Sequence, residues 1–281
     1  MDRVHFSWVL LACMVAMSSC MHSAQDKAVK SDSIPLRDIK EGVLVSDEQL
    51  RSEGEYDSRG DEFFEDFLYA YLQDSVFRLR RTMPALEETM ADGTVRHVDA
   101  RELDTDFMFM HGEYTTDIYT IDSERRLDED TALVQASVER IDLEGRNIVS
   151  FDFVKSSGVW NLHAVREVDF AKSDLGDFLN FYSVFASDMT FREQSISPSV
   201  HISMMDPDGN GQTLDGFINR EQWYSIGSAI PEGVISNIRC GQDYGNMKRI
   251  FVEKTGLGNG MSETFIFEKR RQGWKLVGYE N

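Results

Sequence analysis

The sequence predicts an α+β fold, built from two related segments that each begin with helices and end in an antiparallel sheet. A constant shift of 114 residues aligns the two segments without a gap. Each segment has helical periodicity near its start and β-prone stretches near its end. The aligned pairs include Phe64 with Phe178, Phe67 with Phe181, Asp74 with Asp188, Phe77 with Phe191, Arg78 with Arg192, Pro84 with Pro198, Val138 with Val252, Phe151 with Phe265, Trp160 with Trp274 and Leu162 with Leu276.

The first element of each segment is expected to be a helix. Aromatic and aliphatic residues recur at three- and four-residue spacing over 63–72 and again over 175–185, which places them on one helix face. Asp74 and Asp188 then stand where a second, short helix would begin, and their carboxylates can accept its unpaired N–H groups. Capping explains these paired positions better than catalysis does. Pro84 and Pro198 mark the change to extended chain.

The last part of each segment is expected to be an antiparallel meander. The strands are predicted at 132–143, 146–155 and 159–168, and at 247–255, 261–269 and 274–279, because β-prone stretches alternate there with glycine-containing turns. Alternation along the final strands places particular side chains on one face of each sheet. These side chains are Trp160, Leu162 and Ala164 in the first segment and Trp274, Leu276 and Gly278 in the second.

The amino-terminal segment indicates export and lipidation. Residues 1–19 have a weakly basic start and a short apolar run, too short for a membrane span, which identifies a signal peptide. The run ends in Met17-Ser18-Ser19-Cys20, which resembles a bacterial lipobox, so Cys20 is the predicted lipidation site. The alternative is a plain signal peptide with Cys20 left as an odd thiol. Residues 20–60 are polar and charge-mixed and are predicted to form a flexible linker.

Residues 61–170 and 171–281 each resemble a nuclear-transport-factor-2-like (NTF2-like) domain, with an F-x-x-F helix, a D-x-x-F-R step, a proline and a meander ending in G-x-W or G-W. The resemblance implies two tandem cones of the cystatin-like kind, with amino-terminal helices packed on a curved antiparallel sheet. Together with the lipobox, it is similar to a family of lipoproteins of unknown function from Gram-negative gut bacteria. Members of this superfold include isomerases, dehydratases and binding modules, so the fold leaves the activity open.

Charge and cysteine content exclude some classes of protein. The 281 residues carry 49 acidic and 29 basic side chains, a net charge of −20, which disfavours nucleic acid as a partner. The three cysteines are too few for a disulfide scaffold. Residues 61–170 hold 25 acidic and 11 basic side chains and 171–281 hold 14 and 11, so the acidity belongs mainly to the first segment. A solvated surface explains this better than a basic partner does.

No motif identifies a metal, a cofactor or a catalytic residue. Residues 206–211 match the first half of a calcium loop, but Phe217 stands where its closing glutamate should be, so a hairpin turn is favoured over a cation site. None of the six histidines lies in a metal-binding spacing, and His163 is expected to face solvent. Cys240 is expected to be a buried small hydrophobe rather than a nucleophile.

Aromatic residues are the best candidates for a binding cavity between helix and sheet, although most of them are expected to be plain core. Arg78 and Arg192 could place a polar group in such a cavity or could pair with a neighbouring acid. The candidate lining residues are Tyr71, Phe153 and Trp160 in the first segment and Phe185, Arg192, Trp223 and Trp274 in the second.

The function predicted from these features is a lipid-anchored protein of a Gram-negative cell envelope, on the periplasmic side or the cell surface. It would act as a non-enzymatic binding or assembly module for a small molecule or a protein. The alternative is an enzyme of the isomerase or dehydratase type, with a titratable Asp, Tyr or His inside one cone. A third possibility is a structural role in which the two repeats bury a face against each other.

Overall fold

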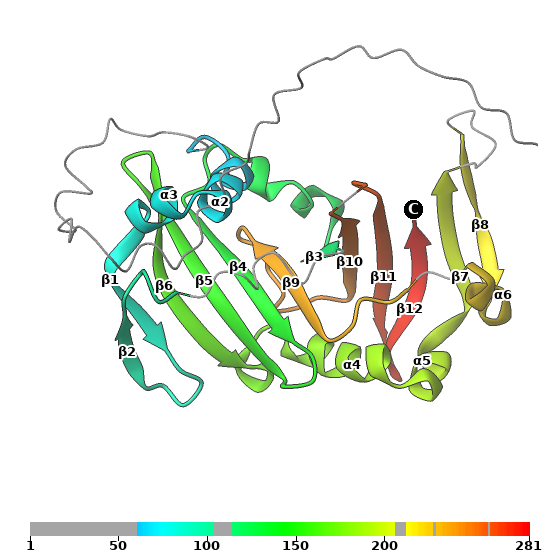
Figure 1. The fold of residues 1–281 in the computed structure, drawn as a ribbon. Helices are drawn as coiled ribbons and strands as arrows, with labels where there is room; N and C mark the ends of the chain where they lie inside the picture. Colours follow the sequence, from blue (N-terminus) through cyan, green and yellow to red (C-terminus); the bar gives the residue numbers. More distant parts are fainter. Residues whose placement is uncertain (1–60, 104–113, 206–211, 227–228, 258) are drawn as a thin grey trace, which may run out of the picture. The chain divides into compact units, whose positions relative to one another are not determined.

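A computed structural model describes residues 61–103, 114–205, 212–226, 229–257 and 259–281. All of these belong to one compact unit, Asp47–Asn281. They form two six-stranded sheets with a few helices, so the predicted α+β class is confirmed (Figure 1). None of the helices in the described ranges has the length and apolar character needed to cross a membrane.

The first half of the described chain follows the predicted order of helices and then strands. Its elements are α2 (Phe64–Gln73), α3 (Ser75–Arg80), β1 (Thr82–Thr89), β2 (Val95–Val98), β3 (Tyr114–Tyr119), the 3₁₀ turns η3 (Asp122–Glu124) and η4 (Leu127–Glu129), β4 (Gln135–Asp142), β5 (Asn147–Ser156) and β6 (Val159–Asp169).

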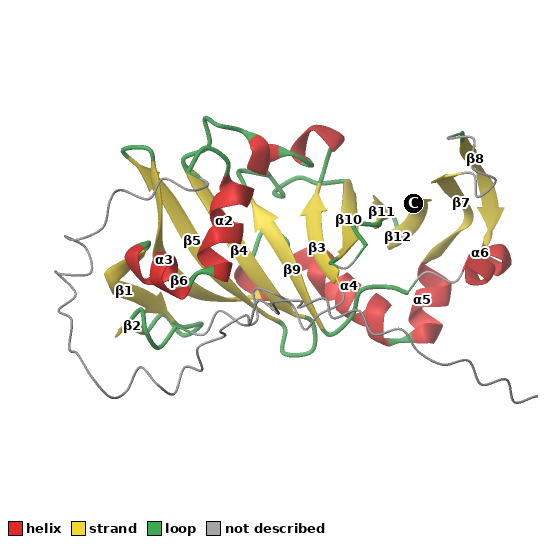
Figure 2. Cartoon of the chain, turned by 45° about the horizontal axis from the view of Figure 1, so that its top comes forward, coloured by secondary structure: helices red, strands yellow, loops and turns green. Residues whose placement is uncertain are grey.

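The second half has a similar order, with a third helix between its second and third strands. Its elements are the 3₁₀ turn η5 (Phe170–Lys172), α4 (Gly176–Ser187), α5 (Met189–Ser195), β7 (Ile196–Met205), β8 (Thr213–Asn219), α6 (Arg220–Ile226), β9 (Val234–Arg239), β10 (Arg249–Gly256), β11 (Ser262–Arg270) and β12 (Gly273–Glu280). Figure 2 shows that in each half the helices are short relative to the strands on which they lie.

Helix caps account for the start of the two short helices. The Asp74 side chain accepts from the N–H groups of Val76 and Phe77 at the start of α3, at 2.9 and 3.0 Å. Asp188 does the same for α5 with Thr190 and Phe191, at 2.8 and 3.0 Å. The predicted capping role of both aspartates is therefore confirmed.

The two sheets exchange one strand each. The first sheet has the order β2-β1-β6-β5-β4-β9 and the second has β3-β10-β11-β12-β7-β8, so β9 completes the first sheet and β3 completes the second. β3 pairs antiparallel with β10, and β9 pairs antiparallel with β4. The boundary predicted between residues 170 and 171 remains a prediction. β3 precedes that boundary but belongs to the second sheet, and β9 follows it but belongs to the first.

Reciprocal hydrogen bonds join the exchanged strands where they meet. The Thr116 N–H donates to Ser236 Oγ at 2.8 Å, and the Ser236 N–H donates to Thr116 Oγ1 at 2.9 Å. Each hydroxyl also donates to the other residue's carbonyl, at 2.7 and 2.8 Å. One position further on, Asn237 Oδ1 accepts from Ile118 N–H at 2.9 Å and Asp117 Oδ1 accepts from Ile238 N–H at 3.0 Å. The backbone groups of the two strands are thus satisfied by side chains of the opposite half.

A bulge interrupts the last strand of each half, so the strict in–out alternation expected from the sequence is wrong beyond that point. In β6 the register with β5 shifts so that His163 is the extra residue, and in β12 the register with β11 shifts at Val277. Val165 and Tyr279 are therefore buried on the inner face, where strict alternation placed Ala164 and Gly278. The two bulges are 114 residues apart, the same spacing as the sequence shift.

The apolar core has two main parts, each rich in aromatic rings. One gathers α2, α3 and the first sheet around Phe64, Phe67 and Trp160. The other gathers α4, α6 and the second sheet around Phe178 and Phe267, whose rings meet edge to face at 5.4 Å between centroids. Each core also takes residues from the opposite half, so burial as well as strand pairing links the two halves.

Candidate functional site

The three first-half residues predicted to line a cavity lie in the first core. Tyr71, Phe153 and Trp160 are at most 1% exposed; Tyr71 belongs to the aromatic face of α2, and the rings of Phe153 and Trp160 lie against that face. The Tyr71 hydroxyl is 2.7 Å from Thr82 Oγ1, and burial raises the Tyr71 pKa to about 12. Trp160 Nε1 has no hydrogen-bond partner within the described residues.

The three second-half aromatics lie in the second core. Phe185 is fully buried, and Trp223 of α6 meets the ring of Tyr279 edge to face at 5.5 Å. Trp274 Nε1 donates to Asp177 Oδ2 at 2.9 Å, so its indole has the acceptor that Trp160 lacks. In both cores the predicted residues fill the space between helix and sheet.

The two repeated arginines act on the ends of the helices before them. Arg192 donates to the carbonyl of Phe185 at 2.8 Å and to that of Ala186. Arg78 donates to the carbonyls of Tyr71 and Leu72, at 3.4 and 3.2 Å. In this position each guanidinium satisfies carbonyls at a helix carboxyl end, a role that was not among the two expected from the sequence.

Two of the remaining predictions, Cys20 and the segment 206–211, lie outside the described residues. The strands on either side of 206–211, β7 and β8, pair as an antiparallel hairpin. His163 is exposed, as predicted. Cys240 is 5% exposed, as expected for a buried hydrophobe, and burial raises the pKa of its thiol to about 12.

Sequence reasoning missed a pocket with a polar cluster beside it at one end of the second sheet. Lys254 of β10 and Glu263 of β11 stand directly opposite each other in the strand register, and their Nζ and Oε2 atoms are 2.7 Å apart. The other carboxylate oxygen of Glu263 accepts from the hydroxyl of Tyr279 at 2.7 Å. The ammonium also lies 3.4 Å from the carbonyl of Ala229. These three side chains form what we call the Lys-Glu-Tyr cluster.

A pocket of about 360 Å³ opens beside the Lys-Glu-Tyr cluster. That volume lies within the range of small-molecule sites, about 300–1,000 Å³. The ring of Tyr114, from β3, lies 5.3 Å from Lys254 Nζ, so the exchanged strand supplies one wall. The other lining residues in the described ranges are Ala229, Gly256, Asn259, Met261 and Asn281.

Local backbone features of β10 to β12 build this pocket. Gly256 ends β10, where an added Cβ would lie 2.4 Å from Asn259 Oδ1, so a larger residue would displace the Asn259 side chain. Asn259 Oδ1 also accepts from the N–H of Met261 at 3.0 Å, which fixes the turn before β11. The bulge at Val277 places Tyr279 on the inner face, within reach of Glu263. The turn thus shapes one side of the pocket, and the bulge completes the cluster.

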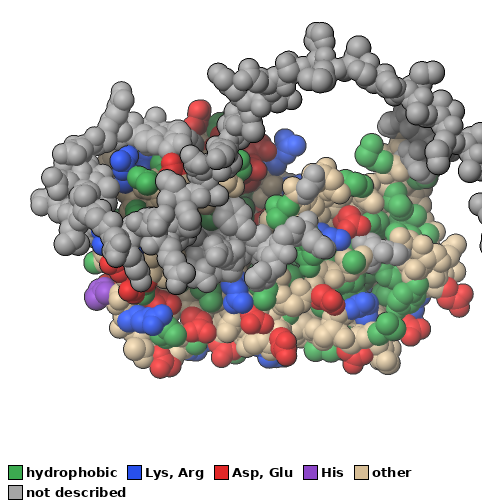
Figure 3. Space-filling view, in the orientation of Figure 1, with side chains coloured by type: hydrophobic (Ala, Val, Ile, Leu, Met, Phe, Trp, Pro, Cys, Tyr) green, Lys and Arg blue, Asp and Glu red, His purple; other side chains and the backbone are tan. Residues whose placement is uncertain are grey.

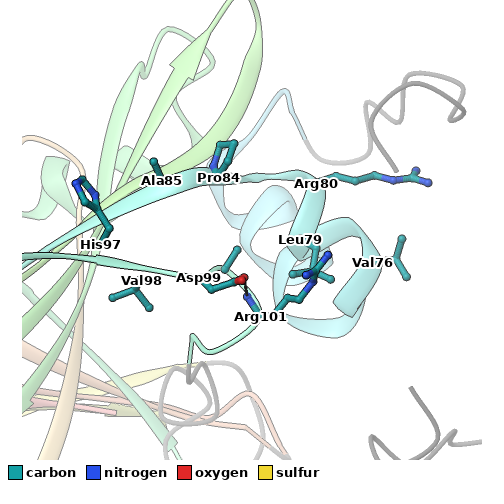
Figure 4. Close-up of a pocket in the computed structure, with 10 residues that line it drawn as sticks. Val76, Leu79, Arg80, Pro84, Ala85, His97, Val98, Asp99 and Arg101 are labelled. Atoms are coloured by element: carbon teal, nitrogen blue, oxygen red, sulfur yellow. Dashed lines mark hydrogen bonds between the residues drawn. The ribbon is translucent and has the colours of Figure 1, made fainter. Parts of the chain in front are cut away.

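A second hollow of about 360 Å³ lies between α3 and the β1–β2 hairpin in the first half (Figure 4). Apolar side chains of Leu79, Pro84 and Val98 line it. In the view of Figure 4 the side chain of Arg101 reaches toward Leu79, whereas Arg80 points away from the strands. Most of its lining side chains are exposed, and it holds no cluster of buried polar groups within the described residues.

A narrow crevice of about 30 Å³ lies beside Asp117, with room for about one water molecule. Burial, and after it the negative charges of Asp128, Glu253 and Glu65, raise the pKa of Asp117 to about 7. The N–H of Ile238 acts in the opposite direction by donating to the carboxylate. Within the described ranges no group of His, Cys, Asp and Glu side chains is arranged to hold a metal ion.

The fold is that of an NTF2-like α+β protein. The chain is similar to an NTF2-like protein from Bacteroides fragilis whose crystal structure is known, with 27% sequence identity and a TM-score of 0.70. The similarity covers 78% of this chain and 96% of that one. A comparison with curated proteins found no match.

Residues 45–281 match the family DUF4348, a domain of unknown function, and the chain belongs to that family. The match spans both sheets, so one family domain covers the helices and strands of both halves.

Proposed function

We propose that this protein is a lipid-anchored binding module of a Gram-negative cell envelope, built from two tandem NTF2-like cones, which takes a small molecule into the pocket beside the Lys-Glu-Tyr cluster. The observation that carries this proposal is a pocket of ligand size with a partly buried ion pair, at 18% and 20% side-chain exposure, on its wall. The first core, in contrast, is filled by its aromatic rings.

The tandem arrangement rests on matched details in the two halves. The capped short helices, the arginines on the preceding helix ends and the two bulges recur at the same positions relative to the 114-residue shift. The strand exchange makes the two cones one folding unit, in which β3 contributes Tyr114 to the pocket of the second cone.

Binding explains the Lys-Glu-Tyr cluster better than catalysis does. Both oxygens of Glu263 already accept from a donor, one from Lys254 and one from Tyr279, and the ammonium of Lys254 is held by Glu263 and the Ala229 carbonyl. A general base or acid needs a lone pair or proton directed at the reacting atom. The cluster is instead a rigid polar wall.

One observation favours the alternative of an isomerase- or dehydratase-type enzyme. The pKa of about 7 at Asp117 suits a general base at neutral pH. The crevice beside it holds about one water, however, so a substrate would have to enter by a rearrangement of η3 and η4. Turnover of a candidate substrate by the wild type and its loss in Asp117→Asn would establish this alternative.

The binding proposal is tested by screening a small-molecule library against the full chain with ligand-observed NMR. Compounds that bind should lose affinity in the double variant Lys254→Met/Glu263→Gln, which removes both charges with little change in volume. The matched control is Arg249→Met/Glu268→Gln, an ion pair across the same two strands but on the opposite face of the sheet. Ligands displaced equally by both double variants would place binding elsewhere and contradict the proposal.

The anchor is tested separately from the pocket. Cells expressing the wild type should incorporate labelled palmitate into the protein, and the Cys20→Ala variant should not. An unlabelled wild type would refute the lipid anchor and leave the pocket proposal standing.

A further inference from the structure

We infer that the protein forms a homodimer through β8, the outermost strand of the second sheet, which pairs antiparallel with β8 of a second copy about Phe217. The inference goes beyond the proposed function and does not depend on a ligand in the pocket. It rests on three properties of the described residues: an open backbone edge, apolar side chains exposed along it, and a strand sequence that complements itself in one register.

The outer edge of β8 has the features of a strand that pairs further. β8 stands at the end of the sheet order, and its seven residues pair with β7 in an unbroken register. An edge strand presents backbone N–H and C=O groups on its free side, and proteins usually protect such an edge with Lys, Pro, a bulge or a short strand. The sequence of β8, TLDGFIN, contains neither Lys nor Pro, and its register has no bulge. The edge that β2 forms in the first sheet is different, because it is four residues long and carries Arg96.

Apolar side chains are exposed along the β8 edge. Phe217 and Leu214 of β8 are 74% and 52% exposed, and Met205, at the end of the adjoining strand, is 71% exposed. We call these three residues the β8 patch. In Figure 3, several hydrophobic side chains lie at the right of the view, where Figure 1 places β7 and β8. An exposed apolar group of this kind marks an interaction surface.

A second strand fits this edge better than a membrane does. Insertion of β8 into lipid would leave the N–H and C=O groups of its free side without hydrogen bonds, and for this reason open sheet edges do not occur in the hydrocarbon layer. The net charge of the chain, −20, also disfavours an anionic membrane surface. A partner strand satisfies the backbone groups and covers the apolar side chains at the same time.

The sequence of β8 favours a second copy as that partner. In a twofold antiparallel pair, one residue lies opposite its own copy and its neighbours pair on either side. With Phe217 at the centre, the two phenyl rings meet, and Asp215 lies opposite Asn219 of the other strand, so a carboxylate faces an amide that can donate to it. With Gly216 at the centre, the Asp215 carboxylate would instead lie opposite the apolar ring of Phe217. The register about Phe217 is therefore favoured.

Gly216 also suits the register about Phe217. A Cβ added to Gly216 would meet nothing within 4 Å beyond its chain neighbours, so the space beside it is open. In this register Ile218 of the second copy lies opposite Gly216, where its side chain can cover that space. A glycine inside a strand weakens the strand but allows a second backbone to approach closely.

The distribution of charge allows two copies to meet at this edge. Residues 171–281 hold 14 acidic and 11 basic side chains, a net charge of −3, whereas residues 61–170 hold 25 and 11, a net charge of −14. β8 lies at the end of the second sheet opposite to β3, the strand that comes from the first half. Pairing through β8 therefore joins the two copies by their less charged halves, and it stops at two copies because each edge is used once.

The test is sedimentation velocity of the full chain at about 1 to 200 µM, with Cys20→Ala in every sample so that lipidation cannot change the mass. The parent chain should show a monomer–dimer equilibrium. Phe217→Lys places two like charges opposite each other at the centre of the pair and should raise the dimer dissociation constant at least about tenfold. Tyr69→Lys is the matched control, since Tyr69 of α2 is an aromatic residue that is 68% exposed in the first half, and it should dimerise like the parent.

Cysteine substitutions test the register. Phe217→Cys places the two thiols opposite each other, so mild oxidation should give a disulfide-linked dimer. In Asp215→Cys the two thiols are about four residues apart along the strands, or about 14 Å, which is too far for a disulfide. Cys240 is buried and does not compete. Melting temperatures check that each variant is folded, and the Phe217→Cys cross-link keeps the test valid if Phe217→Lys is not.

Three results would overturn the inference. The first is a parent chain that stays monomeric up to about 200 µM, including one that binds phosphatidylethanolamine vesicles through Phe217, since the β8 patch would then meet a membrane. The second is a dimer that Phe217→Lys leaves intact, because the copies would then meet elsewhere. The third is a disulfide-linked dimer from Asp215→Cys but not from Phe217→Cys, which would exclude the register. None of these results bears on the pocket, which its own double variants test.

Discussion

Asp117→Asn should stabilise the protein at neutral and alkaline pH and leave its stability unchanged near pH 4. Asp117 has a pKa of about 7, raised from 3.8 mainly by burial and then by neighbouring carboxylates. The folded state therefore holds a proton on Asp117 between pH 4 and 7 that the unfolded state has lost. The contribution of this residue to stability is greatest below pH 4, falls as the pH rises to 7 and is constant above it.

The magnitude follows from the pKa difference. A shift of about three pKa units corresponds to about 4 kcal/mol at about 1.4 kcal/mol per unit, and partial access to solvent lowers the expected gain to about 2–4 kcal/mol above pH 7. Asparagine fits the site, because Asn237 in the corresponding position of the other exchanged strand accepts from Ile118 N–H as Asp117 accepts from Ile238 N–H.

The assay is urea unfolding of wild type and variant at intervals from pH 4 to pH 8.5. The difference in unfolding free energy should rise between pH 4 and 7 and then level off. Glu144→Gln is the control, since it removes one exposed negative charge from a turn and should give a small difference at every pH. A variant that is no more stable than the wild type at pH 8, or a gain that does not depend on pH, would refute the reasoning.

Three further predictions concern the hydrogen bonds between β3 and β9, the Asp188 helix cap and the Cys240 thiol. Thr116→Val removes the hydroxyl that accepts from Ser236 N–H and donates to its carbonyl, so urea unfolding should show a loss of about 2–3 kcal/mol, and a Ser236→Ala background should reduce that loss. Asp188→Ala should cost about 1 kcal/mol in the same assay, with Asp188→Asn close to wild type. In a variant whose one cysteine is Cys240, the thiol should react with a disulfide reagent only after unfolding; rapid reaction of the native protein at pH 8 would contradict its raised pKa.

Much of the fold could be predicted because local sequence determines it. The spacing of Phe64, Phe67 and Tyr71 requires a helix face, and Asp74 and Asp188 mark the next helix starts by their capping chemistry. The meander follows from alternation and glycine turns, with strand ends within a few residues of the prediction. The strand exchange could not be predicted, because the local sequence of a strand such as β3 does not specify which of two equivalent sheet edges it joins.

The pocket was missed for a related reason. In the sequence, Lys254 and Glu263 are charged residues within strands and so are expected on a solvated face. They meet because the register places them opposite each other, and Tyr279 joins them because of a one-residue bulge. The available signal was the departure from the first half, where the aligned residues are Arg140, Val149 and Val165. On the face shown in Figure 3, acidic side chains lie among basic and apolar ones, so a single charged pair is not conspicuous there.

The exchanged strands also constrain the order in which the chain can fold during synthesis. The first sheet is completed by residues 234–239, and β3 finds its partner only when residues 249–256 have been made. An amino-terminal half that has just left the ribosome therefore carries an open sheet edge at β4 and an unpaired β3. Neither is closed until most of the chain is available, so folding should take place in one late cooperative step governed by contacts far apart in sequence.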